Sequence, residues 1–112
     1  MLTPVSKPAS FSRIRALIDD KTWEHIVARY VWWETPAQAE SYAARVLARV
    51  MRLGDFWDIE KVAEEVGDDT LRDVVVHAEA GWFDVRAWHY WHYRLGLSDI
   101  GAVPPLPRRA YS

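Results

Sequence analysis

Residues 34–55 read ETPAQAESYAARVLARVMRLGD, and this stretch predicts the fold class most clearly. Thr35 suits a helix N-cap, and Pro36 suits the first helical position, where its missing N–H needs no partner. Gly54 is a typical residue at which a helix ends. The apolar residues recur at helical spacing, at Ala39, Ala43, Val46, Val50 and Leu53. We therefore expect an amphipathic helix.

The same pattern continues on both sides of this stretch. Residues 11–18 and 22–33 each place apolar residues on one helical face, with Thr22 as a predicted N-cap. Further along, an aspartate follows closely after the glycines at positions 54, 67 and 81, so one predicted helix ends and the next begins. The predicted inward residues are Phe11, Ile14, Leu17, Ile18, Trp23, Ile26, Val27, Tyr30, Ile59, Val62, Ala63, Val66, Leu71, Val74, Val75 and Ala78. These patterns predict an all-α protein, a compact bundle of about five to six short helices with antiparallel neighbours.

The length of 112 residues indicates one domain. Residues 1–9 are expected to form a flexible N-terminal arm, and residues 10–97 the helical domain. Residues 98–112 are expected to form an extended tail, because Pro104, Pro105 and Pro107 cannot continue a helix.

Composition excludes several classes of protein. The net charge of −2 gives no overall attraction to nucleic acid, and the absence of cysteine excludes disulfides and thiolate chemistry. The first ten residues contain no signal-peptide pattern, and no segment resembles a membrane helix. We expect a soluble, cytoplasmic protein without membrane contact.

The sequence contains no pattern typical of catalysis or of cofactor binding. It has no glycine-rich phosphate loop, nucleophile elbow or HExxH motif, and its carboxylates fall at helix starts or on polar helix faces. His89 and His92 share a predicted helix, but no carboxylate pattern accompanies them, so we expect no metal site. The prediction is a protein that is not an enzyme and has no cofactor.

Residues 82–97 read WFDVRAWHYWHYRLGL, an unusual concentration of aromatic side chains. At helical spacing they divide into two faces. The predicted core face holds Val85, Trp88, Trp91, His92 and Leu95. The other face holds Arg86, His89, Tyr90, Tyr93 and Leu97. Aromatic and arginine side chains dominate binding energy at protein interfaces, so the second face is either covered by the folded-back tail or binds a partner protein. Base stacking on nucleic acid is a less favoured alternative.

Arginine stands at positions 45, 49 and 52, which places Arg45, Arg49 and Arg52 on one helix face. This stripe either contacts nucleic acid or an acidic partner, or pairs with Glu60, Glu64 or Glu65 of the next helix. Arg108 and Arg109, after the prolines, are candidate peripheral contacts to an acidic surface.

Residues 49–97, RVMRLGDFWDIEKVAEEVGDDTLRDVVVHAEAGWFDVRAWHYWHYRLGL, and residues 103–109, VPPLPRR, resemble a known family. It consists of small bacterial proteins encoded beside nucleotidyltransferase toxins of the AbiEii/AbiGii type. The resemblance covers about residues 32–109, and its specific part is the aromatic block. Two positions depart from the family pattern: Ala87 stands where serine is common, and Phe56 intervenes before Trp57. The matching positions are Val50, Met51, Gly54, Trp57, Asp58, Leu71, Arg72, Gly81, Phe83, Asp84, Arg86, Trp88, Tyr90, Trp91, His92, Arg94, Leu95, Gly96, Leu97, Pro104, Pro105, Leu106, Pro107 and Arg109.

The resemblance implies an antitoxin-like protein whose partner is a nucleotidyltransferase toxin that modifies tRNA or another nucleotide acceptor. We expect direct protein–protein contact. The predicted contact residues are Arg86, His89, Tyr90, Tyr93, Arg94, Arg108 and Arg109. Three alternatives remain: a nucleic-acid-binding transcriptional regulator that uses the arginine stripe, an antitoxin that competes for the toxin's target RNA, and a structural homodimer subunit.

Overall fold

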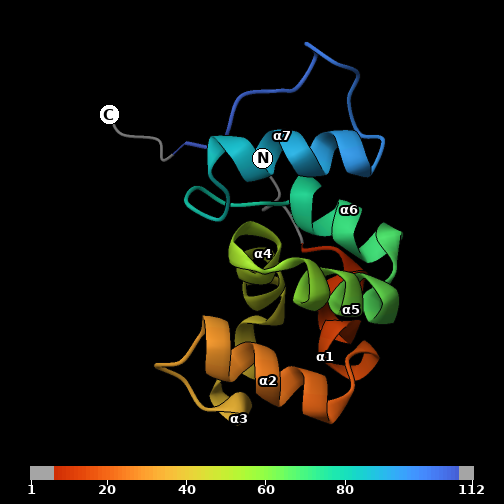
Figure 1. Ribbon diagram of the computed structural model, residues 1–112. Coiled ribbons are helices and arrows are strands. Elements are labelled where there is room, and N and C mark those ends of the chain that lie inside the picture. The colour runs from red at the N-terminus through yellow and green to blue at the C-terminus, as the bar shows by residue number, and fades with distance from the viewer. Residues whose placement is uncertain (1–6, 109–112) are drawn as a thin grey trace, which may run out of the picture.

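The computed structural model describes residues 7–108, and all regular structure in that range is helical (Figure 1). The elements are η1 (Ala9–Arg13), α1 (Ile14–Leu17), α2 (Asp20–Tyr30), α3 (Pro36–Ala39), η2 (Glu40–Tyr42), α4 (Ala43–Leu53), α5 (Phe56–Val66), α6 (Asp68–Val76) and α7 (Val85–Arg94). The expected all-α bundle is confirmed.

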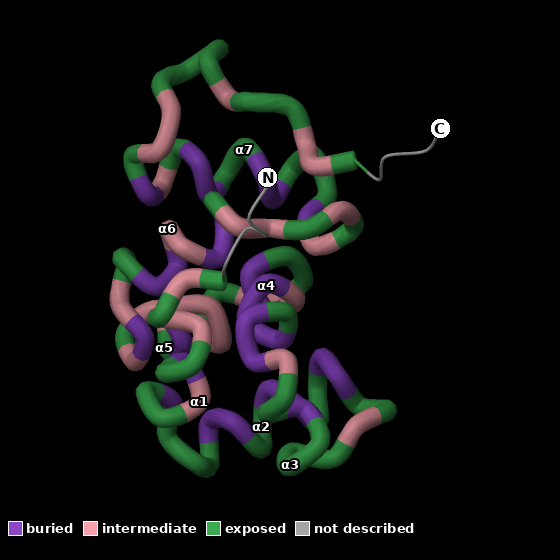
Figure 2. The backbone as a smooth tube through the Cα atoms, turned by 180° about the vertical axis from the view of Figure 1, so that it is seen from behind, coloured by how far each residue is buried: buried purple, intermediate pink, exposed green. Residues whose placement is uncertain are grey.

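Helix α4 forms the centre of the bundle. It packs against α1, α2, α5 and α6, and α7 packs on α6 at one end of the molecule (Figure 1). Seven of its eleven residues are buried, because Ala and Val on almost every side let neighbouring helices approach closely. Buried segments concentrate along α4, and exposed segments dominate the loop that follows α7 (Figure 2).

Local sequence signals fix the helix ends. The side chains of Asp55 and Asp84 accept hydrogen bonds from the backbone N–H groups of Asp58 and Ala87, which caps α5 and α7 as expected. At the other end of α7, Gly96 adopts a positive φ of 69°. Two backbone bonds, Gly96 N–H to the Tyr93 carbonyl and Leu97 N–H to the His92 carbonyl, close a Schellman turn there.

Buried tryptophans connect distant segments through their indole N–H groups. Trp23 of α2 donates to the carbonyl of Pro36 at 2.9 Å, and Trp91 of α7 donates to the carbonyl of Met51 at 2.8 Å. Each bond satisfies a polar group that would otherwise be buried without a partner. Trp91 therefore fixes α7 over the end of α4.

Several local predictions are wrong. The helix expected over residues 35–53 is interrupted by η2, where the Ser41 hydroxyl donates to the backbone carbonyl of Gln38 and the Tyr42 backbone leaves the helical region. Asp19, not Thr22, caps α2, and the Thr22 hydroxyl donates to Glu65 instead.

Three residues expected in the core lie at helix ends and are exposed. Leu17, the last residue of α1, is 43% exposed, Leu53, the last residue of α4, is 47% exposed, and Val85, the first residue of α7, is 60% exposed. At an element end the chain changes direction, so the helical face no longer continues. On α7, Ala87 is buried close to the capped start in place of Val85. None of the helices between residues 7 and 108 combines the length and the apolar character that a membrane crossing requires.

Candidate docking surface

The outer side of α7 is divided into two strips. The first strip lies on the side of α4 and α5 and contains Arg86, Tyr90 and Arg94, at intervals of four residues. His89 and Tyr93 form the second strip, with their rings edge to face at 6.1 Å. Tyr90 and Tyr93 are 49% and 41% exposed. On the inner side, Trp88, Trp91, His92 and Leu95 are buried as predicted, and Leu97, expected on the outer side, instead packs half-buried against the core.

Arg86 and Tyr90 line a surface hollow of about 370 Å³ together with Arg52 and Leu53 of α4. Asp84 also lies in this hollow, where its carboxylate is 3.6 Å from the guanidinium of Arg52. The structure thus brings together two groups that are far apart in sequence, the end of the arginine stripe and one strip of α7.

Arg94, a predicted partner contact, is partly buried and paired within the fold. Its guanidinium pairs with Glu60 of α5 at 2.7 Å, donates to the hydroxyl of Tyr90 at 3.1 Å, and lies 4.9 Å from the ring centroid of Trp91. Burial lowers the pKa of Arg94, but the bonds to Glu60 and Tyr90 outweigh it and the net shift is upward. Arg94 therefore fastens α7 to α5 and holds Tyr90 in place.

The proline-rich tail folds back, but it does not cover the tyrosines. Residues 102–108 form neither helix nor strand. The indole N–H of Trp88 donates to the carbonyl of Pro104 at 2.7 Å, and Val103 and Leu106 pack half-buried against the core. The tail lines a second hollow, of about 430 Å³, beside Phe83 and His89. Arg108 is exposed at the edge of this hollow, and Arg109 lies outside the described residues.

The three arginines of the stripe have different surroundings. Arg49 donates to the carbonyl of Tyr30, and its guanidinium lies 4.9 Å from the ring centroid of Trp33. Arg45 is exposed, and Arg52 pairs only with the half-exposed Asp84 among the described residues. The expected pairing with Glu60, Glu64 or Glu65 is wrong, because no ion pair between the described residues joins the stripe to any of them. Glu60 binds Arg94, and Glu65 binds Thr22 and the backbone of Asp19.

Two pairs of exposed aromatic residues were missed by the sequence reasoning. Trp32 and Trp33, in the turn after α2, are 73% and 52% exposed, and Phe56 and Trp57, at the start of α5, are 66% and 76% exposed. Each pair is arranged edge to face, with ring centroids 5.5 Å and 5.3 Å apart. A usable signal was present: two adjacent aromatic residues at a helix end cannot both point to the core.

A polar cluster joins the end of α2 to the start of α5, the two segments next to these pairs. Tyr30, which ends α2, donates its hydroxyl to Asp58 of α5 at 2.6 Å, and His25 contacts the other carboxylate oxygen at 2.9 Å. Burial and then the bond to Asp58 raise the pKa of Tyr30 to about 12. Burial raises the pKa of Asp58, but the bonds from Tyr30 and His25 and the charges of His25 and Arg29 outweigh it, so that this pKa lies below its ordinary value.

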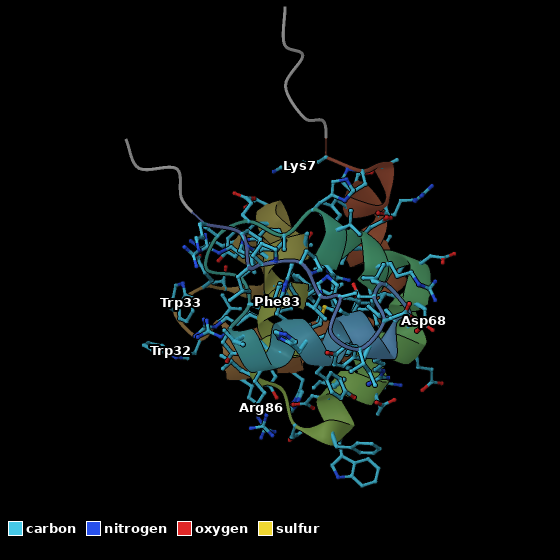
Figure 3. All side chains as sticks on the ribbon, turned by 90° about the horizontal axis from the view of Figure 1, so that it is seen from above. Lys7, Trp32, Trp33, Asp68, Phe83 and Arg86 are labelled. Carbon is cyan, nitrogen blue, oxygen red and sulfur yellow. The ribbon has the colours of Figure 1, made fainter. Side chains whose placement is uncertain are left out.

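We define the arginine–aromatic face as the surface formed by the exposed pairs, the hollow and the stripe. Seen from above, Trp32, Trp33 and Arg86 lie on the side of the molecule away from Asp68 (Figure 3), and Figure 1 shows the turn after α2 and helix α7 at opposite ends of the bundle. Helix α4 connects the two ends, because Arg49 lies over Trp33 and Arg52 lines the hollow with Arg86. We include Phe56 in this surface because it lies one helical turn before Glu60. Glu60 pairs with Arg94, and Arg94 donates to the hydroxyl of Tyr90. The members of the face are Trp32, Trp33, Arg45, Arg49, Arg52, Leu53, Phe56, Trp57, Arg86 and Tyr90.

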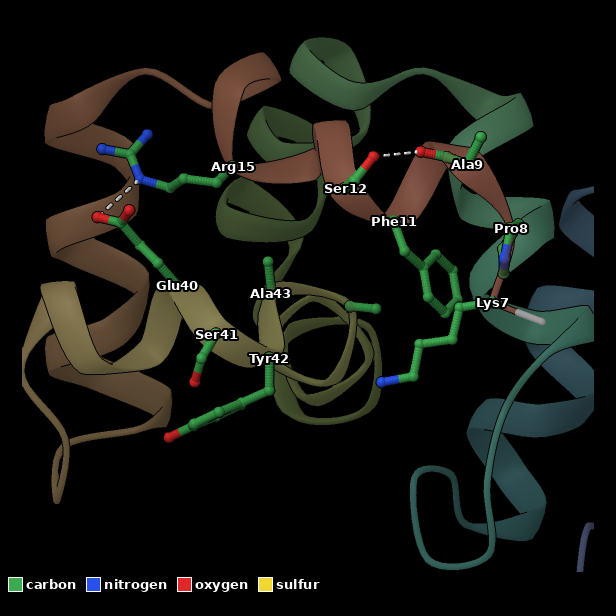
Figure 4. A pocket seen from close by; sticks show the side chains of 11 residues that line it. Lys7, Pro8, Ala9, Phe11, Ser12, Arg15, Glu40, Ser41, Tyr42 and Ala43 are labelled. Atoms are coloured by element: carbon green, nitrogen blue, oxygen red, sulfur yellow. Dashed lines mark hydrogen bonds and ion pairs between the residues drawn. The ribbon is translucent and has the colours of Figure 1, made fainter. Parts of the chain in front are cut away.

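A further hollow, of about 410 Å³, lies between η1 and η2 (Figure 4). Its cations are Arg15, whose guanidinium binds Asp20 at 2.6 Å and lies 3.6 Å from Glu40, and Lys7 (Figure 4). It contains neither of the two exposed aromatic pairs.

Within residues 7–108 there is no group of three or more histidine, aspartate or glutamate side chains placed to hold a metal ion. Comparison of the chain with protein-family models, curated proteins and solved structures gives no significant match.

Proposed function

We propose that this chain is an antitoxin-like protein that binds a nucleotidyltransferase toxin directly and neutralises it. The class of the partner comes from the sequence resemblance. The single observation that supports direct contact is that Tyr90 and Arg86 stay exposed next to Arg52 although the tail folds back onto α7. An exposed surface of this composition is typical of protein interfaces.

The proposal assigns a role to each contact residue. Arg86 and Tyr90 are the central anchors, His89 and Tyr93 lie on the adjacent strip, and Arg108 is peripheral. Arg94 acts by positioning Tyr90. The proposal places the complex in the cytoplasm, where a toxin that modifies tRNA acts.

A transcriptional regulator that reads DNA through the arginine stripe has less support. Arg49 already contacts Trp33 and the Tyr30 carbonyl, which leaves Arg45 and Arg52 as the exposed members of the stripe. Two neighbouring cations give weak electrostatic binding to a phosphate backbone.

The proposed function is tested by co-expression with the nucleotidyltransferase that the resemblance places beside this chain in the genome. We expect the two proteins to elute together on size exclusion, with nucleotidyl transfer abolished. Separate elution with rescue of the host would favour competition for the target RNA. Separate elution without rescue would remove the antitoxin function altogether.

A further inference from the structure

The arginine–aromatic face differs in charge from the protein as a whole. The whole chain carries a net charge of −2, yet the face holds Arg45, Arg49, Arg52 and Arg86. Two carboxylates beside it are already paired, Asp55 with Arg29 at 3.0 Å and Glu60 with Arg94. Asp84 lines the hollow and is half-exposed, and Glu34, next to Trp33 in sequence, is partly buried. The four arginines outnumber these two carboxylates, so the face keeps a positive charge.

The aromatic groups on the face have a shape that suits a protein surface. In both pairs the rings stand nearly perpendicular, at 88° for Trp32 and Trp33 and at 83° for Phe56 and Trp57. Perpendicular rings form a thick apolar projection, whereas successive bases stack on flat, accessible ring faces. The guanidinium of Arg49 also lies over the ring of Trp33. These features favour apolar sockets in a protein over the bases of a nucleic acid.

A second copy of the chain is a poor occupant of this face. A symmetric dimer would bury the same patch on both sides of the interface, so that the arginines of both copies would be brought together with only their own few carboxylates between them. Like charges brought together at an interface are strongly unfavourable. The occupant must supply negative charge.

We propose that the arginine–aromatic face binds an acidic surface of the partner protein, whose carboxylates meet Arg52 and Arg86 and whose apolar sockets receive the two edge-to-face aromatic pairs. This inference rests on the proposed function for the identity of the partner. It adds the chemistry of the partner's surface and two groups of contacts, in the turn after α2 and at the start of α5, that the family resemblance does not assign.

The test measures affinity of the full chain for the neighbouring nucleotidyltransferase by calorimetry. One variant reverses charge on the face, Arg52→Glu with Arg86→Glu. Its control, Arg13→Glu with Lys21→Glu, makes the same change of charge at exposed positions outside the face. A second variant, Trp32→Ala with Trp57→Ala, removes one ring from each pair, and Ile100→Ala, 93% exposed in the loop after α7, is its control. Circular dichroism confirms that each variant is folded.

We expect both face variants to weaken binding by at least about tenfold, and both controls by less than about twofold. Raising NaCl from about 50 to about 500 mM should weaken the wild-type complex and have little effect on the charge-reversal variant. A complex that forms with wild-type affinity in both face variants overturns the inference and leaves the proposed function intact.

If the wild-type chain does not bind the nucleotidyltransferase, the proposed function fails, and a second measurement tests the inference about the face. Amide chemical shifts are followed on adding poly-L-glutamate and, separately, oligothymidylate. Shifts on the face with poly-L-glutamate support an acidic protein surface. Shifts with oligothymidylate alone assign the face to nucleic acid and overturn the inference, as does the absence of shifts with both.

Discussion

The indole N–H of Trp88 donates to the backbone carbonyl of Pro104 at 2.7 Å, and this bond places the proline-rich tail beside Phe83 and His89. Tyr90 lines a different hollow, with Arg52 and Arg86. The Trp88 indole thus holds the tail over one part of α7 and leaves the part with Tyr90 available to a partner.

The first prediction concerns this bond. Trp88→Phe keeps an aromatic ring in the core but leaves the Pro104 carbonyl without its donor, so we expect a loss of about 1 kcal/mol in the free energy of unfolding. Hydrogen exchange of the tail amides should be faster, while Tyr90 stays as exposed as before. Trp32→Phe, at a 73% exposed position, is the matched control and should be neutral. Equal stability of both variants would mean that the tail is not held by Trp88.

The second prediction separates the two sides of α7. Tyr90→Ala combined with Tyr93→Ala removes two half-exposed rings, so it should weaken partner binding while the helix content stays unchanged. Trp91→Ala removes a side chain that is 1% exposed and bonded to Met51, and should cost about 3–5 kcal/mol of stability. Circular dichroism and thermal melting distinguish the two effects. Unfolding of the tyrosine double variant would place these residues in the core.

The third prediction concerns the turn between α4 and α5. A Cβ atom at Gly54 would lie 2.5 Å from the Val50 carbonyl oxygen and 2.9 Å from a side-chain carbon of Ile59. Gly54→Ala must therefore move the backbone, at a cost of about 1–3 kcal/mol. Because Phe56 begins α5 directly after this turn, partner affinity should fall as well. A thermal melt unchanged from wild type would show that the turn has room for a methyl group.

The fourth prediction follows from the lowered pKa of Asp58. A carboxyl whose folded pKa lies below its unfolded value stabilises the fold above the unfolded pKa, and this contribution is lost as the pH falls through the folded pKa. We expect the wild type to lose more stability than Asp58→Asn when the pH is lowered from about 5 to about 2. Asp99→Asn, in the exposed loop after α7, should behave like the wild type. Chemical denaturation at each pH measures the difference.

The sequence predicted what depends on local geometry. The caps at Asp55 and Asp84 and the inward stripe of α7 from Trp88 to Leu95 all follow from residues a few positions apart. These features need no knowledge of the neighbouring helices.

What the sequence did not predict depends on contacts between distant segments. The exposure of Leu53 and Val85 and the break at η2 depend on where the chain turns. The pairing of Arg94 with Glu60, 34 residues away, is one such contact. The arginine–aromatic face could not be recognised, because its members come from the turn after α2, from α4, α5 and α7.

The most direct test of the account is an inhibition titration with purified components. The nucleotidyltransferase is assayed for nucleotidyl transfer while this protein is added in increasing amounts. We expect activity to fall to a sharp end point at a fixed stoichiometric ratio, and the Arg52→Glu with Arg86→Glu variant to shift or abolish this end point. Full activity in the presence of excess folded protein would contradict direct neutralisation.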